Sequence, residues 1–354
     1  MSESRSLIPR GTRPHAGTRR ARVCVGAALI FFFVLVFGVR PARSDAQRLP
    51  SSSFGPSVIV ETAQAPASTS EPKSAAGTLS PAQAIVLGVI EGVTEFLPIS
   101  STGHLVVAEK LMGVGTTDST KDAADAYSIV IQAGAILAIV FLYYRRLISV
   151  AKGVVGRDDD GRKVGISLVV AFLPAAIVGF IFDKTIKAHL LAPAPVVAAW
   201  ILGGVVLLVL SSSGWLEREK EGADLVSLSI RSALIIGGAQ CLALWPGTSR
   251  SLVTIVAAVL IGLSLHAAVE FSFLLGLVTL GAATAYDTLK HGHEIVATFG
   301  LASPVIGFVA AFLAAIVAVR WMVSYLQTHS LAIFGWYRIG LAFGTIGLLV
   351  TGRI

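Results

Sequence analysis

Charged residues are scarce in this chain: Asp, Glu, Lys and Arg together make up 14% of its 354 residues. Hydrophobic residues make up 54%, and the mean hydropathy is +0.78. This balance excludes an ordinary soluble domain. It predicts an all-α integral membrane protein that crosses the bilayer several times.

Acidic residues and cysteines are both few. The formal net charge is +7, but the basic residues fall in short loops and the N-terminal arm, without a basic face interleaved with aromatic residues. Nucleic-acid binding is therefore not expected. The two cysteines, Cys24 and Cys241, lie far apart in apolar segments. Their spacing excludes a disulfide framework and a cysteine metal site.

The N-terminal segment differs from the rest of the chain. Arginines precede the apolar run Val23–Val39, and small residues follow it. This layout predicts a secretory signal peptide within residues 1–46; an uncleaved N-terminal anchor is the alternative. Residues 47–79 are rich in Ser, Pro, Ala and Thr, which predicts a disordered linker.

The pattern of apolar runs in residues 80–354 predicts a polytopic membrane domain built from two similar halves, about 80–214 and 225–354. In each half, two short apolar runs meet at a break, at Pro98 and at Pro246, and three long runs follow. Short helices broken at a polar turn predict a re-entrant hairpin in each half. The six long runs, each long enough to span a bilayer, lie at about 125–144, 165–183, 196–213, 267–289, 300–320 and 331–351.

Three crossings per half is an odd number, so the second half is expected to enter from the opposite side, as an inverted repeat. The local sequences of the breaks align with one gap, which pairs Glu91 with Gln240, Pro98 with Pro246 and Ser101 with Ser249. Basic residues concentrate in the predicted loop 145–163. By the positive-inside rule this loop is cytoplasmic, and residue 80 lies outside.

The first break carries two carboxylates in an apolar helix. Glu91 and Glu95 lie four residues apart, on one helical face. Charges are costly inside a membrane, so such a pair predicts a functional site. Two neighbouring carboxylates either share a proton or bind a divalent cation, Mg²⁺ or Ca²⁺.

Hydroxyls and a histidine follow those carboxylates. Ser100 and Ser101 lie at the break, and His104 is one helical turn beyond Ser101. A Ser101–His104 pair would supply a nucleophile and its base, or an acid for the leaving group. Each residue alone is more often a helix cap or a packing residue, so the prediction rests on their clustering.

The second break has the composition of a phosphate site. Arg250 offers a planar fork of donors, and Gly247 permits close approach of the backbone. Ser249 and Ser251 lie at a predicted helix start, where free N–H groups favour an anion, and Thr254 follows one turn later. The alternative for Arg250 is an interfacial arginine that extends to the membrane surface.

Two further charges lie in apolar segments. Glu270 is expected to pair with Arg250 or to orient the hairpin. Arg338 is expected to approach a lipid phosphate or to lie at the membrane interface.

The stretches EGVTEFLPISSTGH (Glu91–His104) and LALWPGTSRSLVT (Leu242–Thr254) closely resemble the two signature motifs of the bacitracin-resistance (BacA-type) undecaprenyl-diphosphate phosphatases. Further matches are FLYYRRL, EFSFLL and the Tyr337–Arg338 pair, so the resemblance covers about residues 80–354. It implies hydrolysis of undecaprenyl diphosphate, a polyprenyl diphosphate lipid, at the periplasmic face of the bacterial inner membrane. This reaction recycles the lipid carrier for peptidoglycan synthesis and confers bacitracin resistance.

The resemblance also implies a divalent cation and a set of functional residues: Glu91, Glu95, Ser101, His104, Ser249, Arg250 and Thr254. A lipid-phosphate transporter or flippase is the alternative, because inverted repeats with broken helices are transporter architecture. The sequence leaves open whether Ser101 or a water attacks the phosphate. It also leaves the oligomeric state open, with a homodimer among the options.

Overall fold

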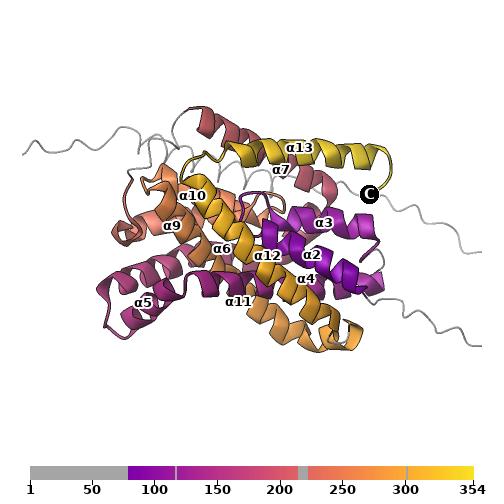
Figure 1. Cartoon of the computed structure of the whole chain (residues 1–354), viewed down its shortest axis with the longest axis horizontal. Helices are drawn as coiled ribbons and strands as arrows, with labels where there is room; N and C mark the ends of the chain where they lie inside the picture. Colours follow the sequence, from indigo (N-terminus) through magenta and orange to yellow (C-terminus); the bar gives the residue numbers. More distant parts are fainter. Residues whose placement is uncertain (1–78, 116–117, 214–221, 300–301) are drawn as a thin grey trace, which may run out of the picture.

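The computed structural model describes residues 79–115, 118–213, 222–299 and 302–354 (Figure 1). The predicted signal peptide or anchor and nearly all of the predicted linker lie outside these residues. The described residues are helical almost throughout. In chain order the main helices are α2 (Pro81–Thr94), α3 (Ser101–Met112), α4 (Asp118–Leu142), α5 (Tyr144–Val154), α6 (Asp159–Leu190), α7 (Pro193–Ser212), α9 (Ile230–Gln240), α10 (Arg250–Leu260), α11 (Leu265–Phe299), α12 (Ala302–Leu326) and α13 (Ala332–Val350).

Six of the described helices are long and apolar enough to cross a membrane, which confirms the predicted number. The candidate spans are Ala124–Leu142, Asp159–Phe182, Pro193–Ser212, Leu265–Leu289, Ala302–Leu326 and Ala332–Val350. The helices that flank the two breaks are shorter. Each reaches only partway through a bilayer at 1.5 Å per residue.

Helix α2 begins where the sequence predicts, at Ser80–Pro81. The Ser80 hydroxyl accepts a hydrogen bond from the Gln83 N–H, and the Gln83 side chain accepts one from the Ser80 N–H. This capping box satisfies two N–H groups that the helix itself leaves free.

Small residues let α2 pack closely against α12. A Cβ atom added at Gly88 would collide with the Gly307 carbonyl, and one added at Gly92 would collide with the Ala311 carbonyl. This small-xxx-small spacing brings the two backbones together, as is common between membrane helices. Helix α12 also packs against α4, so the first short helix is held by a long helix of the second half.

The segment 145–163 corrects a prediction: it was expected to be a loop, and much of it is helix α5. The Asp158 carboxylate then caps α6, accepting hydrogen bonds from the Gly161 N–H at 2.8 Å and the Ser149 hydroxyl at 2.6 Å. These bonds lower the pKa of Asp158, with the Gly161 bond as the largest cause. The basic residues of segment 145–163 therefore lie on α5 and on the first turns of α6, which form a helical corner.

The helices of the second half pack around the second break. Helix α9 packs against α6, α10 packs against α11, and α13 lies along α7 (Figure 1). The largest apolar core includes nearly every residue of α10, from Leu252 to Val259. The helix that begins at Arg250 is thus buried on all sides, which fixes its N-terminus in space.

Candidate functional site

The two breaks share an unusual backbone conformation. Ser100 (φ 73°, ψ 101°) and Ser249 (φ 74°, ψ 112°) are the only non-glycine residues with positive φ in the described chain, and each is the N-cap of the helix after its break. Such conformations cost on the order of 1–3 kcal/mol and gather at functional sites. The backbone therefore matches Ser249 to Ser100, one residue before the predicted partner Ser101.

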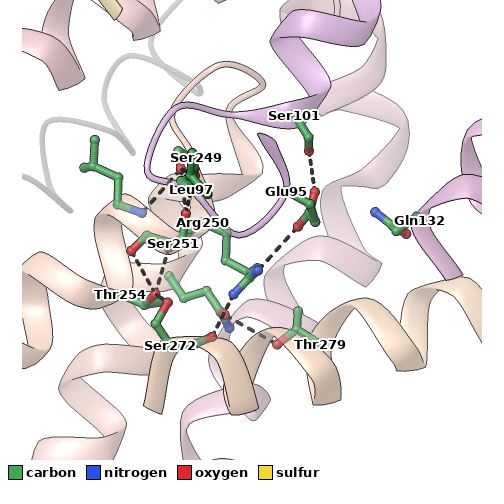
Figure 2. A network of polar contacts seen from close by, with 12 residues as sticks. Glu95, Leu97, Ser101, Gln132, Ser249, Arg250, Ser251, Thr254, Ser272 and Thr279 are labelled. Atoms are coloured by element: carbon green, nitrogen blue, oxygen red, sulfur yellow. Dashed lines mark hydrogen bonds and ion pairs between the residues drawn. The ribbon is translucent and has the colours of Figure 1, made fainter. Parts of the chain in front are cut away.

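The two breaks meet. The Ser251 hydroxyl donates to the Leu97 carbonyl at 2.8 Å, and the Ser249 hydroxyl lies 3.5 Å from the same oxygen. Figure 2 shows the loop of the first break passing over the start of α10. The polar clusters predicted at the two breaks, about 150 residues apart, thus form one site.

Arg250 joins the second break to the first. Its Nη2 lies 3.3 Å from Glu95 Oε1, and its Nη1 donates to the Ser272 carbonyl at 2.9 Å (Figure 2). The guanidinium also lies 5.6 Å from the centre of the Phe96 ring. Gly276 makes room for it, since a Cβ there would overlap the guanidinium. Arg250 is thus part of the site and does not extend to the membrane surface.

The carboxylates of α2 lie in the protein interior. Glu91 is 2% exposed and Glu95 is 8% exposed. Glu95 lies beside Glu91 and contacts both breaks: Oε1 faces Arg250, and Oε2 accepts a hydrogen bond from the Ser101 hydroxyl (Figure 2). One carboxylate therefore connects the arginine of the second break to the serine of the first.

His104 occupies a different position from the one expected. Its Nδ1 lies 2.6 Å from the Ser100 carbonyl, and its Nε2 lies 2.9 Å from the Tyr337 hydroxyl. Both ring nitrogens are engaged, whereas Ser101 bonds to Glu95. The structure therefore does not bring Ser101 and His104 together as a pair, because each side chain is bonded to other partners.

The hydroxyls of α10 are engaged within the protein. Ser249 caps the helix by accepting from the Leu252 N–H, and its hydroxyl is 3.0 Å from that of Ser251. Thr254 bonds to the Arg250 carbonyl at 2.8 Å and to the Ser272 hydroxyl at 2.7 Å. These bonds fix α10 to the first break and to α11. A role for these residues in phosphate binding stays a prediction.

The structure corrects the expected Glu270–Arg250 pair and the expected interfacial position of Arg338. Glu270 pairs with Arg146 rather than Arg250, with Nε 2.6 Å from Oε1, because α5 places Arg146 over the start of α11. Arg338 is fully buried, not interfacial, and bonds to main-chain carbonyls. Both charges hold helices together.

Sequence reasoning missed several residues around the site. Tyr337 bonds to His104, Ser272 holds Arg250 and Thr254, and Gly276 provides space. Gln132 on α4 projects toward the region of Glu95 (Figure 2), and its carbonyl oxygen accepts from Thr284 at 2.9 Å. Two of them lay in stretches that resemble the family: Ser272 in EFSFLL and Tyr337 in the Tyr337–Arg338 pair.

The carboxylates offer part of a cation site. Among the described residues, no cluster of three or more Asp, Glu, His or Cys has the spacing of a metal site. Mg²⁺ often binds to one or two carboxylates together with substrate phosphates, and Glu91 and Glu95 fit that pattern. Gly247, with φ 94°, leaves the backbone of the second break close to α7.

An apolar groove of about 430 Å³ adjoins the site. It is bounded by the end of the first break, by α12 and by α13, and Tyr337 forms part of its wall. The groove is thus in contact with the residue that binds His104. Its lining residues are Val93, Leu97, Ile99, Val317, Ala318, Trp321, Ile333, Phe334 and Tyr337.

Comparison with known proteins gives a consistent result. Residues 84–344 match the family described as "Bacitracin resistance protein BacA". The chain is 46% identical to the Undecaprenyl-diphosphatase of Sorangium cellulosum over 260 residues, covering 73% of this chain and 83% of the relative. It is 46% identical to that of Nitrosomonas eutropha over 270 residues, covering 75% and 93%. It is 43% identical to Undecaprenyl-diphosphatase 1 of Chromobacterium violaceum over 267 residues, covering 75% and 94%. With these motifs meeting in one buried site, the chain belongs to the BacA family of bacitracin resistance proteins.

Proposed function

We propose that this protein hydrolyses undecaprenyl diphosphate to undecaprenyl phosphate and inorganic phosphate, the activity named for its relatives. One observation carries the proposal: Glu95 lies between Arg250 and Ser101, so a phosphate-binding cation and a nucleophile meet at one carboxylate. Phosphoryl transfer needs these parts, because its catalysis is mainly positioning and charge stabilisation.

Arg250 binds the diphosphate in this proposal. Its Nε is buried and has no hydrogen-bond partner among the described residues, so one donor of the fork is available to a phosphate oxygen. The N-terminus of α10 adds free N–H groups and a favourable dipole, with Ser249 at the cap. Ser100, Gly247, Ser251 and Thr254 complete the proposed phosphate-binding set.

Ser101 is the proposed nucleophile and Glu95 its base. The Ser101 oxygen attacks the terminal phosphorus, its proton passes to Glu95, and the bond to the bridging oxygen breaks to release undecaprenyl phosphate. Water then hydrolyses the phosphoserine. Direct attack by water remains the alternative, with His104 as an acid or base. An acid-quenched phosphoenzyme that is lost in Ser101→Ala supports serine attack, whereas turnover by Ser101→Ala near the wild-type rate supports water.

A divalent cation is part of the proposal. Glu91 and Glu95 would hold it together with the diphosphate oxygens, and when bound it would neutralise charge on the phosphates. Loss of phosphate release on chelation, restored by Mg²⁺ or Ca²⁺, would support this role.

The prenyl chain is assigned to the apolar groove beside Tyr337. The groove begins at the first break and continues between α12 and α13, so a chain lying in it would leave its diphosphate near Glu95. Apolar walls favour an isoprenoid because burial of such a chain is worth about 25 cal/mol per Å².

The inverted repeat and the outward-facing site are also proposals. Contacts repeat between the halves: α2 packs on α12 and α9 on α6, while α4 meets α11 and α7 meets α13. The matched conformations of Ser100 and Ser249 support the same two-fold relation. Basic residues in the α5–α6 corner support a cytoplasmic location for this corner, and in this orientation the site would open toward the periplasm.

Release of phosphate from undecaprenyl diphosphate by purified protein tests the proposal. Arg250→Ala should abolish release, whereas Arg320→Ala, a change at an exposed arginine of α12, should not. Undiminished release by Arg250→Ala would refute the proposed site. Lipid translocation without hydrolysis would instead support a transporter.

A further inference from the structure

Arg338 on α13 is a fully buried arginine whose partners are all main-chain carbonyls. Nη2 donates to Ala199 at 2.8 Å and to Gly247 at 2.9 Å; Nη1 lies 3.4 Å from the Pro98 oxygen, and Nε lies 3.4 Å from the Trp200 oxygen. Its side chain is 0% exposed. Such a cation is costly to bury, so its hydrogen bonds must compensate for lost hydration.

These carbonyls come from three separate parts of the chain. Pro98 belongs to the first break and Gly247 to the second, while Ala199 and Trp200 belong to α7. Pro98 lies two residues before Ser100, and Gly247 lies two residues before Ser249. Arg338 therefore holds each break next to its positive-φ serine.

Helix α7 supports the same arrangement through two tryptophans. Trp200 on α7 donates from Nε1 to the Ile99 carbonyl at 3.1 Å, and Trp245 of the second break donates to the Pro195 carbonyl at 3.1 Å. Both breaks are thus bonded to α7, and Arg338 is the one side chain among the described residues with hydrogen bonds to both breaks and to α7.

The contacts require the shape of arginine. A planar guanidinium directs five N–H donors in a fixed fork, whereas lysine offers one point charge with three donors. Space for the fork is provided by Gly203 on α7, because a Cβ there would overlap Arg338 Nη2.

We propose that Arg338 is a positioning residue for the reaction: it sets the separation of the two breaks, and so the placement of Ser101 and Glu95 relative to Arg250. This role rests on the proposed function. A misplacement of about 1 Å can cost about 100-fold in rate, even when the change lies away from the chemistry. The geometry matters most in the transition state, so kcat should change more than KM.

The test measures kcat and KM for undecaprenyl diphosphate in wild type, Arg338→Lys and Gly203→Ala, at a temperature well below each melting temperature. Both variants should lose roughly 100-fold in kcat with KM within about threefold. Gly203→Ala retains Arg338 but displaces its guanidinium. It therefore tests the positioning role even if Arg338→Lys does not fold. Arg320→Lys on the exposed face of α12 is the matched control and should retain wild-type kcat.

The outcomes separate the two proposals. A purely structural role for Arg338 predicts a lower melting temperature with unchanged kcat in the folded variants, and this result would overturn the positioning role. A wild type that releases no phosphate would refute the proposed function itself, and the positioning role with it.

Discussion

Ser100 and Ser249 have the same backbone conformation within about 11° in ψ, although 149 residues separate them. Their side chains make different hydrogen bonds. The Ser249 hydroxyl caps α10, whereas Ser100 makes no side-chain cap bond to α3. The two breaks therefore share a strained backbone, but only one compensates for the strain with its side chain.

This difference predicts opposite effects of glycine at the two serines. Ser100→Gly should raise the free energy of unfolding by about 1 kcal/mol, because glycine tolerates positive φ. Ser249→Gly relieves similar strain but loses the cap and the bonds to Leu97 and Ser251, so it should destabilise the protein by about 1 kcal/mol. Thermal unfolding in detergent measures both. Equal shifts in the two variants would contradict the prediction, and Ser100→Ala, which retains the strain, is the control.

Glu95→Gln should lower kcat by about 10²–10⁴-fold. The amide cannot accept the proton of Ser101, and it leaves Arg250 without its ion-pair partner. Phosphate release measures the effect. Glu270→Gln on α11 is a matched control, since Glu270 is also a buried carboxylate paired with an arginine but contacts Arg146 and not the site. An equal loss of kcat in the two variants would show that the effect comes from lower protein stability and not from the chemical step.

Val317→Trp should weaken the use of long prenyl chains. Val317 lines the apolar groove and is 68% exposed, so a larger side chain there fills the groove without disturbing the core. KM for undecaprenyl diphosphate should rise about tenfold, while KM for a short-chain prenyl diphosphate should change little. Leu313→Trp, an exposed position on α12 outside the groove lining, is the control. A rise in both KM values would argue against the groove as the prenyl site.

Arg146→Ala should destabilise the protein by about 2 kcal/mol, because it leaves the Glu270 carboxylate, whose side chain is 10% exposed, without its partner. The surface ion pair of Arg162 with Asp159 provides the comparison. Arg162→Ala should cost at most about 0.5 kcal/mol. Unfolding midpoints of the two variants measured side by side test this, and similar values would show that the Arg146 pair is no stronger than a surface pair.

The sequence predicted the features that depend on local pattern and composition. Six spans, the break at each hairpin and the capped start at Ser80 follow from apolar run length, proline and an N-cap serine. The sequence also predicted a polar cluster at each break, with Glu95 in the first and Arg250 in the second. These features depend on neighbouring residues or on a repeated layout, which a sequence displays directly.

Partners set by three-dimensional packing were not predictable in this way. Nothing in the sequence indicates that Glu270 faces Arg146, because α5 was expected to be a loop and its direction depends on the corner at Asp158. The burial of Arg338 depends on the space left by Gly203, and a glycine in an apolar helix has many possible explanations. The choice of partner is decided by which surfaces the helices present to one another.

The bond from Arg338 to Pro98 spans 240 residues and so bears on the order of synthesis. The first break emerges from the ribosome early, but the guanidinium that binds its carbonyl belongs to α13, which is made after all the other described helices. Until α13 inserts, the carbonyls of Pro98 and Gly247 lack this donor. The site is therefore completed only once α13 has been made, and a chain that stops before α13 should be inserted in the membrane yet inactive.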